Sequence, residues 1–183
     1  MERVNVISKQ VIRIRNFELV NFSVLFVALA VALPLITHQF NLAGQIFLPM
    51  HIFVFVAALL LGWHTGLLVG LLTPIISHFV SGLPLTTLLP QITVELAIYG
   101  LMAGFIREKL GWNLWLSILV AMIVGRVGLG FVVWLLGTNQ AGPVNQVITV
   151  VKLGWPGILI QLALVPLIVI ALKKFLANKF QDV

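Results

Sequence analysis

Arg126 is the charged residue of this sequence that most needs an explanation. It lies in the middle of an apolar run over 114–136, which is long enough to cross a bilayer. Placing a guanidinium at the centre of a membrane-spanning helix costs about 2.5 kcal/mol or more. Arg126 therefore requires an acidic partner, a water-filled cavity or an anionic ligand.

Three polar residues of another apolar run are placed to meet it. Gln91, Glu95 and Tyr99 follow one another at intervals of four, so they share one face of a helix over 89–106. If that helix enters the membrane from outside, Glu95 lies about 9 Å and Arg126 about 15 Å below the outer ends of their helices. An extended arginine spans the difference, so a Glu95–Arg126 ion pair is feasible.

This pairing leaves two interpretations of Arg126 open, and they can coexist. The pair either neutralises two buried charges, or Arg126 contacts a ligand directly. Buried ion pairs seldom add stability, and ionisable residues within a membrane usually mark function. The stripe formed by Gln91, Glu95 and Tyr99 is either bonded to neighbouring helices or one wall of a cavity, and we favour the cavity wall.

The remaining candidates for ligand binding lie near the outer ends of predicted helices. His51 and His78 fall at the outer ends of the second and third spans, as packing residues or as ligand contacts. Neither has a partner at HxxxH spacing, so we expect no metal site. Trp155 is an interfacial anchor or an aromatic wall for a ligand. A polar loop over 137–153 is either solvated or a lid; its polar residues include Asn139, Asn145, Gln146 and Lys152.

Composition indicates the class of protein in which these residues lie. The chain has 183 residues, of which 61% are hydrophobic and 9% charged, whereas a soluble domain carries about 25% charged residues. Its mean hydropathy is +1.14. We predict an all-α integral membrane protein, a bundle of six spanning helices. The expected spans cover 18–37, 49–62, 64–80, 89–106, 114–136 and 154–172.

The basic residues predict the orientation. Nine of the eleven Lys and Arg residues lie in the tails or in the short loop over 107–113, which all fall on one side of a six-span bundle. Both termini are therefore predicted to be cytoplasmic, in a multi-pass protein of the cell membrane. We divide the chain into a basic tail over 1–17, a membrane domain over 18–172 and a tail over 173–183. The positive-inside rule accounts for the net charge, so no nucleic-acid partner is expected.

Several chemistries have no support in the sequence. There is no cysteine, no GxSxG nucleophile motif and no pair of carboxylates within the spans, so an enzyme is not expected. A GxxxxGK[ST] phosphate loop is also missing, so any ATP hydrolysis must be carried out by another subunit.

Small residues mark two candidate packing faces. Ala28 and Ala32 share one face of the first span, and Gly62, Gly66 and Gly70 form a double GxxxG pattern. Small side chains at this spacing allow a neighbouring helix to approach closely.

Several segments, taken in order, resemble a known family. They are MHIFVFVAALLLG over 50–62, GLLVGLLTP over 66–74, SGLP over 81–84, ELAIYGLMAG over 95–104, Gly125-Arg126 and GWPGILIQ over 154–161. Together they look like the substrate-binding S component of an energy-coupling factor (ECF) vitamin transporter, with the pantothenate type as the nearest likeness.

The resemblance implies a six-helix protein that binds a vitamin in an outward-facing pocket. It also implies a transmembrane coupling subunit, the T component, and two cytoplasmic ATPases that use ATP, with no cofactor bound by this chain. The first-helix face with Ala28 and Ala32 matches the family's partner interface. The substrate-binding set that we predict consists of Arg126, Glu95, Gln91, Tyr99, His51, His78, Asn145, Lys152 and Trp155.

Other functions remain as alternatives. The ligand is pantothenate or another vitamin, such as pyridoxine, hydroxymethylpyrimidine, folate or cobalamin. An autonomous proton-coupled transporter that uses Glu95 as its carrier is a second class. A structural membrane protein without a small ligand is a third.

Overall fold

The described part of the chain folds into helices alone. The computed structural model describes residue 11 and residues 16–39, 49–137 and 140–180, and none of these lies in a β-strand. The segment over 38–48, between the first two predicted spans, and the predicted tail over 1–17 fall almost entirely outside these ranges. The helices are α1 (Asn16–Gln39), α3 (Pro49–Leu61), α4 (Trp63–Ser81), α5 (Leu89–Phe105), the short π-helix η1 (Ile106–Leu110), α6 (Leu114–Leu136) and α7 (Pro143–Phe180).

This arrangement confirms the all-α class, and four helices are long and apolar enough to cross a membrane. These four spans are Trp63–Ser81, Leu89–Leu110, Leu114–Leu136 and Pro143–Phe175. The predicted boundaries of α6 coincide with the observed ones, and those of α4 and α5 differ by one residue. The six-span count and the orientation of the termini stay predictions.

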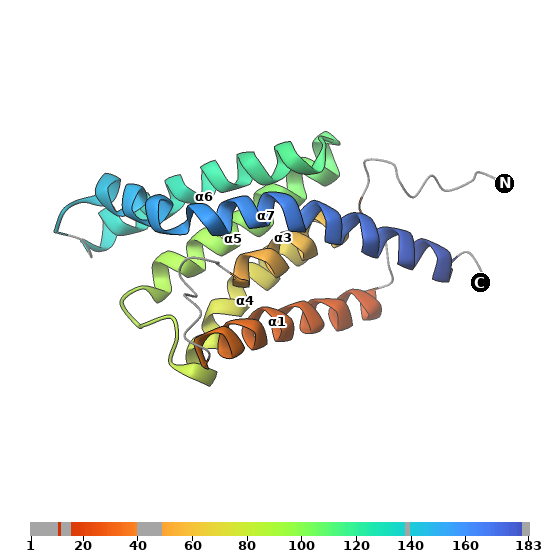
Figure 1. The fold of residues 1–183 in the computed structure, drawn as a ribbon, viewed down its shortest axis with the longest axis horizontal. Helices are drawn as coiled ribbons and strands as arrows, with labels where there is room; N and C mark the ends of the chain where they lie inside the picture. The colour runs from red at the N-terminus through yellow and green to blue at the C-terminus, as the bar shows by residue number, and fades with distance from the viewer. Residues whose placement is uncertain (1–10, 12–15, 40–48, 138–139, 181–183) are drawn as a thin grey trace.

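The helix α3 forms the centre of the bundle (Figure 1). All of its residues except Met50 and Phe53 are buried. A helix that is apolar around its whole circumference is stable only when other helices surround it. With 13 residues, α3 is about 20 Å long, shorter than the bilayer core.

Glycines bring α4 against α5 with their backbones in contact. A Cβ atom on Gly66 would collide with the carbonyl of Gly100, and one on Gly70 would collide with the backbone of Leu96. The packing role predicted for these two glycines is thus confirmed. Gly62 differs, because it forms the turn between α3 and α4 with φ of 95°, a conformation that side-chain-bearing residues rarely adopt.

The helix α6 has two distinct faces. Its buried face includes Ser117, Ala121 and Gly125, while large apolar side chains such as Ile123 and Val127 are 64% and 68% exposed. Exposed apolar side chains along a whole helix are expected when lipid surrounds the protein. Arg126 follows directly after buried Gly125 and is only partly exposed.

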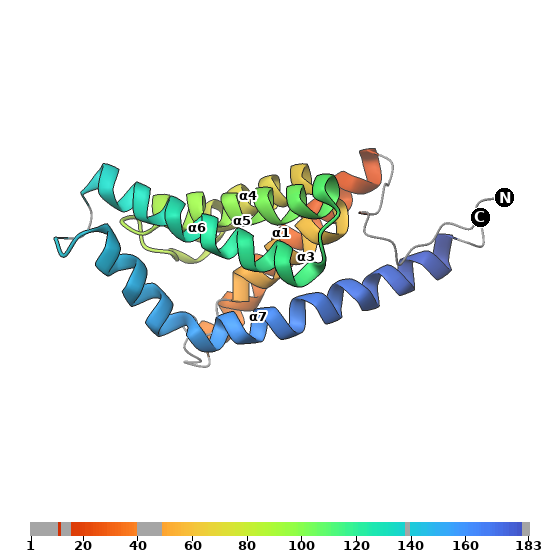
Figure 2. The same ribbon diagram turned by 90° about the horizontal axis from the view of Figure 1, so that it is seen from above.

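The structure corrects the predicted polar loop over 137–153. α7 begins at Pro143, so most of that segment is helical and continues into the sixth span. Proline is favoured at the first helical position because its missing N–H would have no partner there. Pro156 and Pro166 lie inside α7, and Figure 2 shows this helix as two limbs that meet at a bend.

The connections gather at two opposite ends of the bundle. The connections α4–α5 and α6–α7 lie at one end, whereas the start of α1, the α3–α4 turn, η1 and the end of α7 lie at the other (Figures 1 and 2). We call the first the loop end and the second the basic end, because the second carries Arg107, Lys109, Lys173 and Lys174.

Candidate functional site

Two neighbouring helices bring a carboxylate, a phenol and a guanidinium together inside the bundle. Glu95 and Tyr99 lie one turn apart on α5, and the Tyr99 hydroxyl donates a hydrogen bond of 2.7 Å to Glu95 Oε1. From α6, Arg126 Nη1 lies 2.5 Å from the same oxygen. The feasible ion pair is therefore formed, and Tyr99 extends it into a three-residue polar cluster.

Burial makes this cluster energetically significant. The Glu95 side chain is 3% exposed and that of Arg126 is 11% exposed. A buried charge without its partner is strongly destabilising, so each residue depends on the other to remain in the core. The guanidinium and the Tyr99 hydroxyl thus both act on the same Glu95 oxygen.

Aromatic rings hold Tyr99 in place. Its ring stacks on Phe55 of α3 at a centroid distance of 5.1 Å and lies 5.5 Å from the ring of His51. On the other side, Gly125 of α6 leaves room for the ring, because a Cβ atom at Gly125 would collide with it. Tyr99 is therefore fixed between α3 and α6, with its hydroxyl directed to Glu95.

His51 lies near the start of α3, at the end of its helix as predicted. Its ring lies beside that of Tyr99, about 15 Å along α5 from Leu89. The start of the short helix α3 is therefore at the depth of the cluster, and His51 borders the cluster there.

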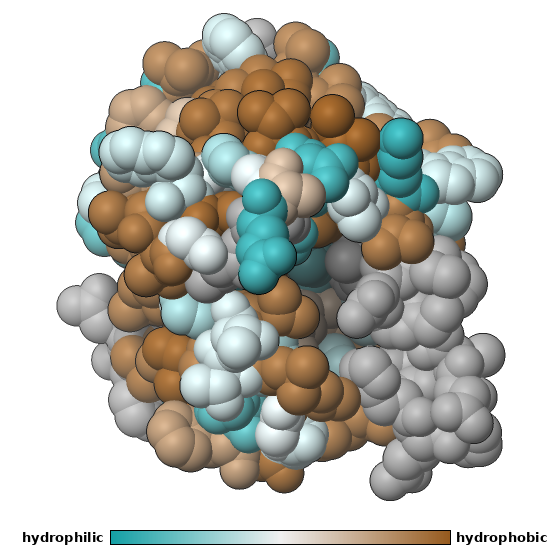
Figure 3. Space-filling view, turned by 90° about the vertical axis from the view of Figure 1, so that its left-hand side faces the viewer, coloured by the Kyte–Doolittle hydropathy of each residue, from teal (hydrophilic) through white to brown (hydrophobic). Residues whose placement is uncertain are grey.

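Gln91 lies one turn before Glu95 and is also buried. Its Nε2 is 3.5 Å from the carbonyl of Thr87, a long hydrogen bond. The predicted stripe of Gln91, Glu95 and Tyr99 thus lies on one buried side of α5. Figure 3 looks onto the loop end, where hydrophilic side chains gather around a hollow in the middle of the face.

Comparison with known protein families indicates the kind of protein in which this cluster occurs. The family model described as "ECF transporter, substrate-specific component" matches residues 19–177. The chain belongs to this family. No individual curated protein and no solved structure matches it significantly.

Members of this family are substrate-binding subunits of transporters, not catalysts, and they associate with T and ATPase components. This chain is accordingly a membrane-embedded S component. The residues that the structure describes contain no group of three His, Cys, Asp or Glu side chains that could hold a metal ion.

Several predicted binding residues of the S component do not join the cluster. Asn145, Lys152 and Trp155 are exposed on α7, and Asn139 lies outside the described residues. His78 Nδ1 lies 2.8 Å from the carbonyl oxygen of Pro84, so this side chain fastens the end of α4 to the following connection. The predicted lid required a polar loop over 137–153, but most of that segment is part of helix α7.

Two residues were missed by the sequence analysis. Phe55 shapes the position of Tyr99 but is an ordinary residue in an apolar helix, so it gives no polar signal. Gln161 is 1% exposed, and its Nε2 has no hydrogen-bond partner in the described chain. Gln161 could have been identified from the sequence, because it is an isolated amide in the apolar span over 154–172.

The predicted partner face of the S component is accessible. Ala28 and Ala32 are both exposed on α1, beside Leu25 and Leu29, which are 49% and 40% exposed. A face of small and apolar side chains suits either lipid or a closely packed helix.

Proposed function

We propose that this S component captures pantothenate, or a vitamin with a similar carboxylate, from outside the cell. The T component and two ATPases that use ATP would then drive its delivery, and this chain would bind no cofactor itself. The observation that carries the proposal is the buried cluster of Arg126, Glu95 and Tyr99. Burying ionisable groups inside a membrane protein costs free energy, so their presence indicates a functional site.

The chemistry of the cluster suits a ligand that carries both a carboxylate and hydroxyl groups. A guanidinium presents several N–H donors in one plane, which match a carboxylate in bidentate fashion. Glu95 Oε1 lies against Nη1 of Arg126, and a guanidinium has five N–H donors in all, so further donors can serve a second carboxylate. Gln91 and Gln161 are buried amides that can bond the hydroxyl and amide groups of the ligand.

The orientation in the membrane follows from charge. We propose that the basic end faces the cytoplasm and that the loop end faces outward, because Lys and Arg are enriched in cytoplasmic segments. The cluster is then reached from outside, through the half of the bundle where Gln91 and Glu95 lie.

The test is a binding titration on the purified protein, followed by the fluorescence of its five tryptophans or by calorimetry. We expect pantothenate to bind the wild type and Arg126→Ala to abolish binding. Arg126→Lys keeps the charge but loses the bidentate geometry, so its affinity should fall by about tenfold or more.

A charge-free double variant separates ligand binding from folding. Glu95→Gln with Arg126→Gln removes both charges, so neither is left buried alone. If this variant folds and fails to bind, Arg126 acts on the ligand. If it folds and binds with wild-type affinity, the pair is structural and the proposed role of Arg126 is wrong.

Mass spectrometry of the ligand that co-purifies with the chain tests the vitamin itself. Pantothenate in the wild type, absent from Arg126→Ala, supports the proposal. Another vitamin at stoichiometric amount would replace pantothenate but keep the capture function. Uptake by the isolated chain in vesicles, driven by a pH gradient without ATPases, would contradict the capture function.

A further inference from the structure

The buried pair of Glu95 and Arg126 is electrically balanced before a ligand arrives. Glu95 supplies one negative charge and Arg126 one positive charge, and their side chains are 3% and 11% exposed. A ligand that brings a carboxylate to Arg126 adds a second negative charge to this site. The site would then hold two carboxylates and one guanidinium, and burial would leave the excess negative charge poorly screened by water and salt.

The helices around the pair carry few other titratable groups. Tyr99 is the only other such residue on α5, and Arg126 is the only one on α6. On α3 the only titratable side chain is that of His51, and its ring lies 5.5 Å from that of Tyr99. None of these groups is a second permanent cation that could balance a ligand carboxylate.

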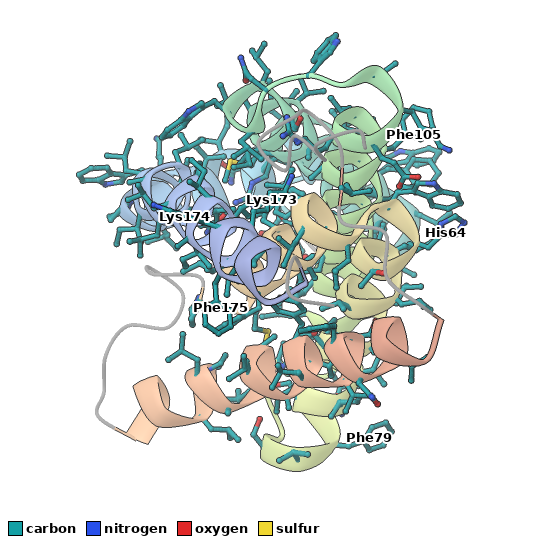
Figure 4. The ribbon with its side chains drawn as sticks, turned by 90° about the vertical axis from the view of Figure 1, so that its right-hand side faces the viewer. His64, Phe79, Phe105, Lys173, Lys174 and Phe175 are labelled. Atoms are coloured by element: carbon teal, nitrogen blue, oxygen red, sulfur yellow. The ribbon has the colours of Figure 1, made fainter. Side chains whose placement is uncertain are left out.

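The titratable groups of α4 and η1 lie farther away. α4 meets α5 where Gly70 packs on Leu96, and its two histidines, His64 and His78, lie about 9 and 12 Å along α4 from Gly70. His64 is exposed at the basic end and points away from the bundle (Figure 4), and His78 lies near the loop end. The charged residues of η1 lie about 18 Å or more beyond Glu95 along the same helix direction; they are Arg107, Glu108 and Lys109.

We propose that binding of a carboxylate ligand to Arg126 is coupled to the uptake of one proton by Glu95. This inference rests on the proposed function, because it requires a ligand that carries a carboxylate. Two carboxylates held against one cation are most stable when they share a proton, since their like charges repel at short distance. The proton restores neutrality, with one guanidinium, one carboxylate and one carboxylic acid in the site.

The geometry indicates which oxygen of Glu95 receives the proton. Oε1 accepts the hydrogen bond from the Tyr99 hydroxyl and lies against Arg126 Nη1. A proton on Oε1 would face these two donors, so the new O–H bond forms at Oε2, with the proton taken from water. Oε1 continues to accept from Tyr99, while other N–H groups of Arg126 bind the ligand. The protonated Oε2 is then a donor for an acceptor oxygen of the ligand.

This coupling makes the affinity depend on pH with a defined sign. The bound state holds one more proton than the free state, so binding becomes tighter as the pH falls. The dissociation constant should fall by about tenfold for each pH unit, as long as Glu95 is ionised in the free protein. A ligand with a hydroxyl group in place of the carboxylate should bind without this dependence, because it leaves the pair balanced.

Titration calorimetry of the full chain measures the proton directly. Pantothenate is titrated at one pH in buffers of different ionisation enthalpy, because a proton drawn from the buffer adds that enthalpy to the measured heat. We expect the uptake of about one proton per bound pantothenate. Pantothenol, in which a hydroxyl group replaces the carboxylate, is the matched ligand, and its binding should take up no proton.

Matched variants assign the proton to Glu95. Glu95→Gln removes the proton acceptor but keeps an oxygen that Tyr99 and Arg126 can approach. It should bind pantothenate without proton uptake, and its affinity should change by less than about twofold per pH unit. Glu108→Gln, which changes a carboxylate at the basic end, should keep the uptake of the wild type. If Glu95→Gln does not fold, because Arg126 is then buried without its counter-charge, the proton count and pH dependence of the wild type decide the outcome.

The possible failures of this coupling and of the proposed function are distinguishable. Pantothenate binding without proton uptake, at an affinity independent of pH, would overturn the coupling and leave capture of the vitamin intact. Uptake that is kept in Glu95→Gln and lost in His51→Gln would assign the proton to His51 and also overturn the inference. If neither pantothenate nor another carboxylate vitamin binds, the proposed function is wrong and the coupling with it.

Discussion

At the scale of single residues, the candidate site depends on how Tyr99 is held. The ring has Phe55 and His51 on one side and Gly125 on the other, and its hydroxyl is bonded to Glu95. The ring has no room to move without losing one of these contacts. The position of the Glu95 carboxylate, and through it that of Arg126, therefore follows from apolar packing.

Gly125→Ala should reduce ligand binding strongly without touching any polar residue. The added methyl group collides with the Tyr99 ring and separates its hydroxyl from Glu95. We expect an affinity loss of about tenfold and a destabilisation of about 1–3 kcal/mol, as for overpacked cores. Binding titrations and thermal unfolding measure the two effects.

Gly130→Ala, five residues further on the same helix, is the matched control. Its Cβ atom would lie 3.3 Å from the Val147 side chain, which is a tight but adjustable contact. Alanine also favours the helix over glycine by about 1 kcal/mol. Wild-type affinity in Gly125→Ala would show that Tyr99 is not part of the binding site.

At the scale of helices, two contacts determine where the site lies. The backbone contact between α4 and α5 fixes α5, and the short α3 brings His51 and Phe55 to the depth of Tyr99. The first limb of α7 adds little to the buried cluster, because its polar residues Asn145, Thr149 and Lys152 are exposed.

Gly100→Ala should prevent stable folding. The methyl group would collide with the backbone of Gly66, and backbone atoms cannot move aside as a side chain does. In Gly128→Ala the methyl group collides with the end of the Ile98 side chain, which can change rotamer, and makes an ordinary contact with Val94. Yield of monodisperse protein and unfolding temperature should fall clearly for Gly100→Ala and little for Gly128→Ala.

Lys152→Ala should change ligand affinity by less than about twofold. The side chain is exposed on α7, so its charge is screened by water and salt before it reaches a buried ligand. The same titration as for Arg126→Ala measures this effect. A large loss would mean that the first limb of α7 moves onto the ligand during binding.

At the scale of the whole molecule, charge is distributed unequally between the two ends. The basic end contains Arg107, Lys109, Lys173 and Lys174, whereas the described residues of the loop end carry no charge between α4 and α5. Such an asymmetry predicts one orientation in the membrane.

Single-cysteine variants can test this orientation directly, since the chain has no cysteine of its own. We expect a membrane-impermeant thiol reagent to label Leu85→Cys in intact cells, because residue 85 is exposed at the loop end. Lys174→Cys should react only after the membrane is permeabilised. The reverse pattern would place the candidate site on the cytoplasmic half and contradict capture from outside.

The sequence alone determined the class of the protein and most of its helices. Apolar runs long enough to cross a bilayer leave little choice except helix, because backbone groups in lipid must be bonded within the segment. The spacing of Gln91, Glu95 and Tyr99 fixed a common helix face, and the cost of a buried arginine indicated that Arg126 needs a partner.

Only the tertiary structure decided which residues meet. Helix periodicity gives the face and approximate depth of a residue on its own helix, but not which neighbouring helix lies opposite. His51 joined the cluster because α3 begins inside the bundle, and Lys152 stayed outside because 143–153 continues α7 as helix. Phe55 could not be found from sequence, because its contribution is the space that it fills beside Tyr99.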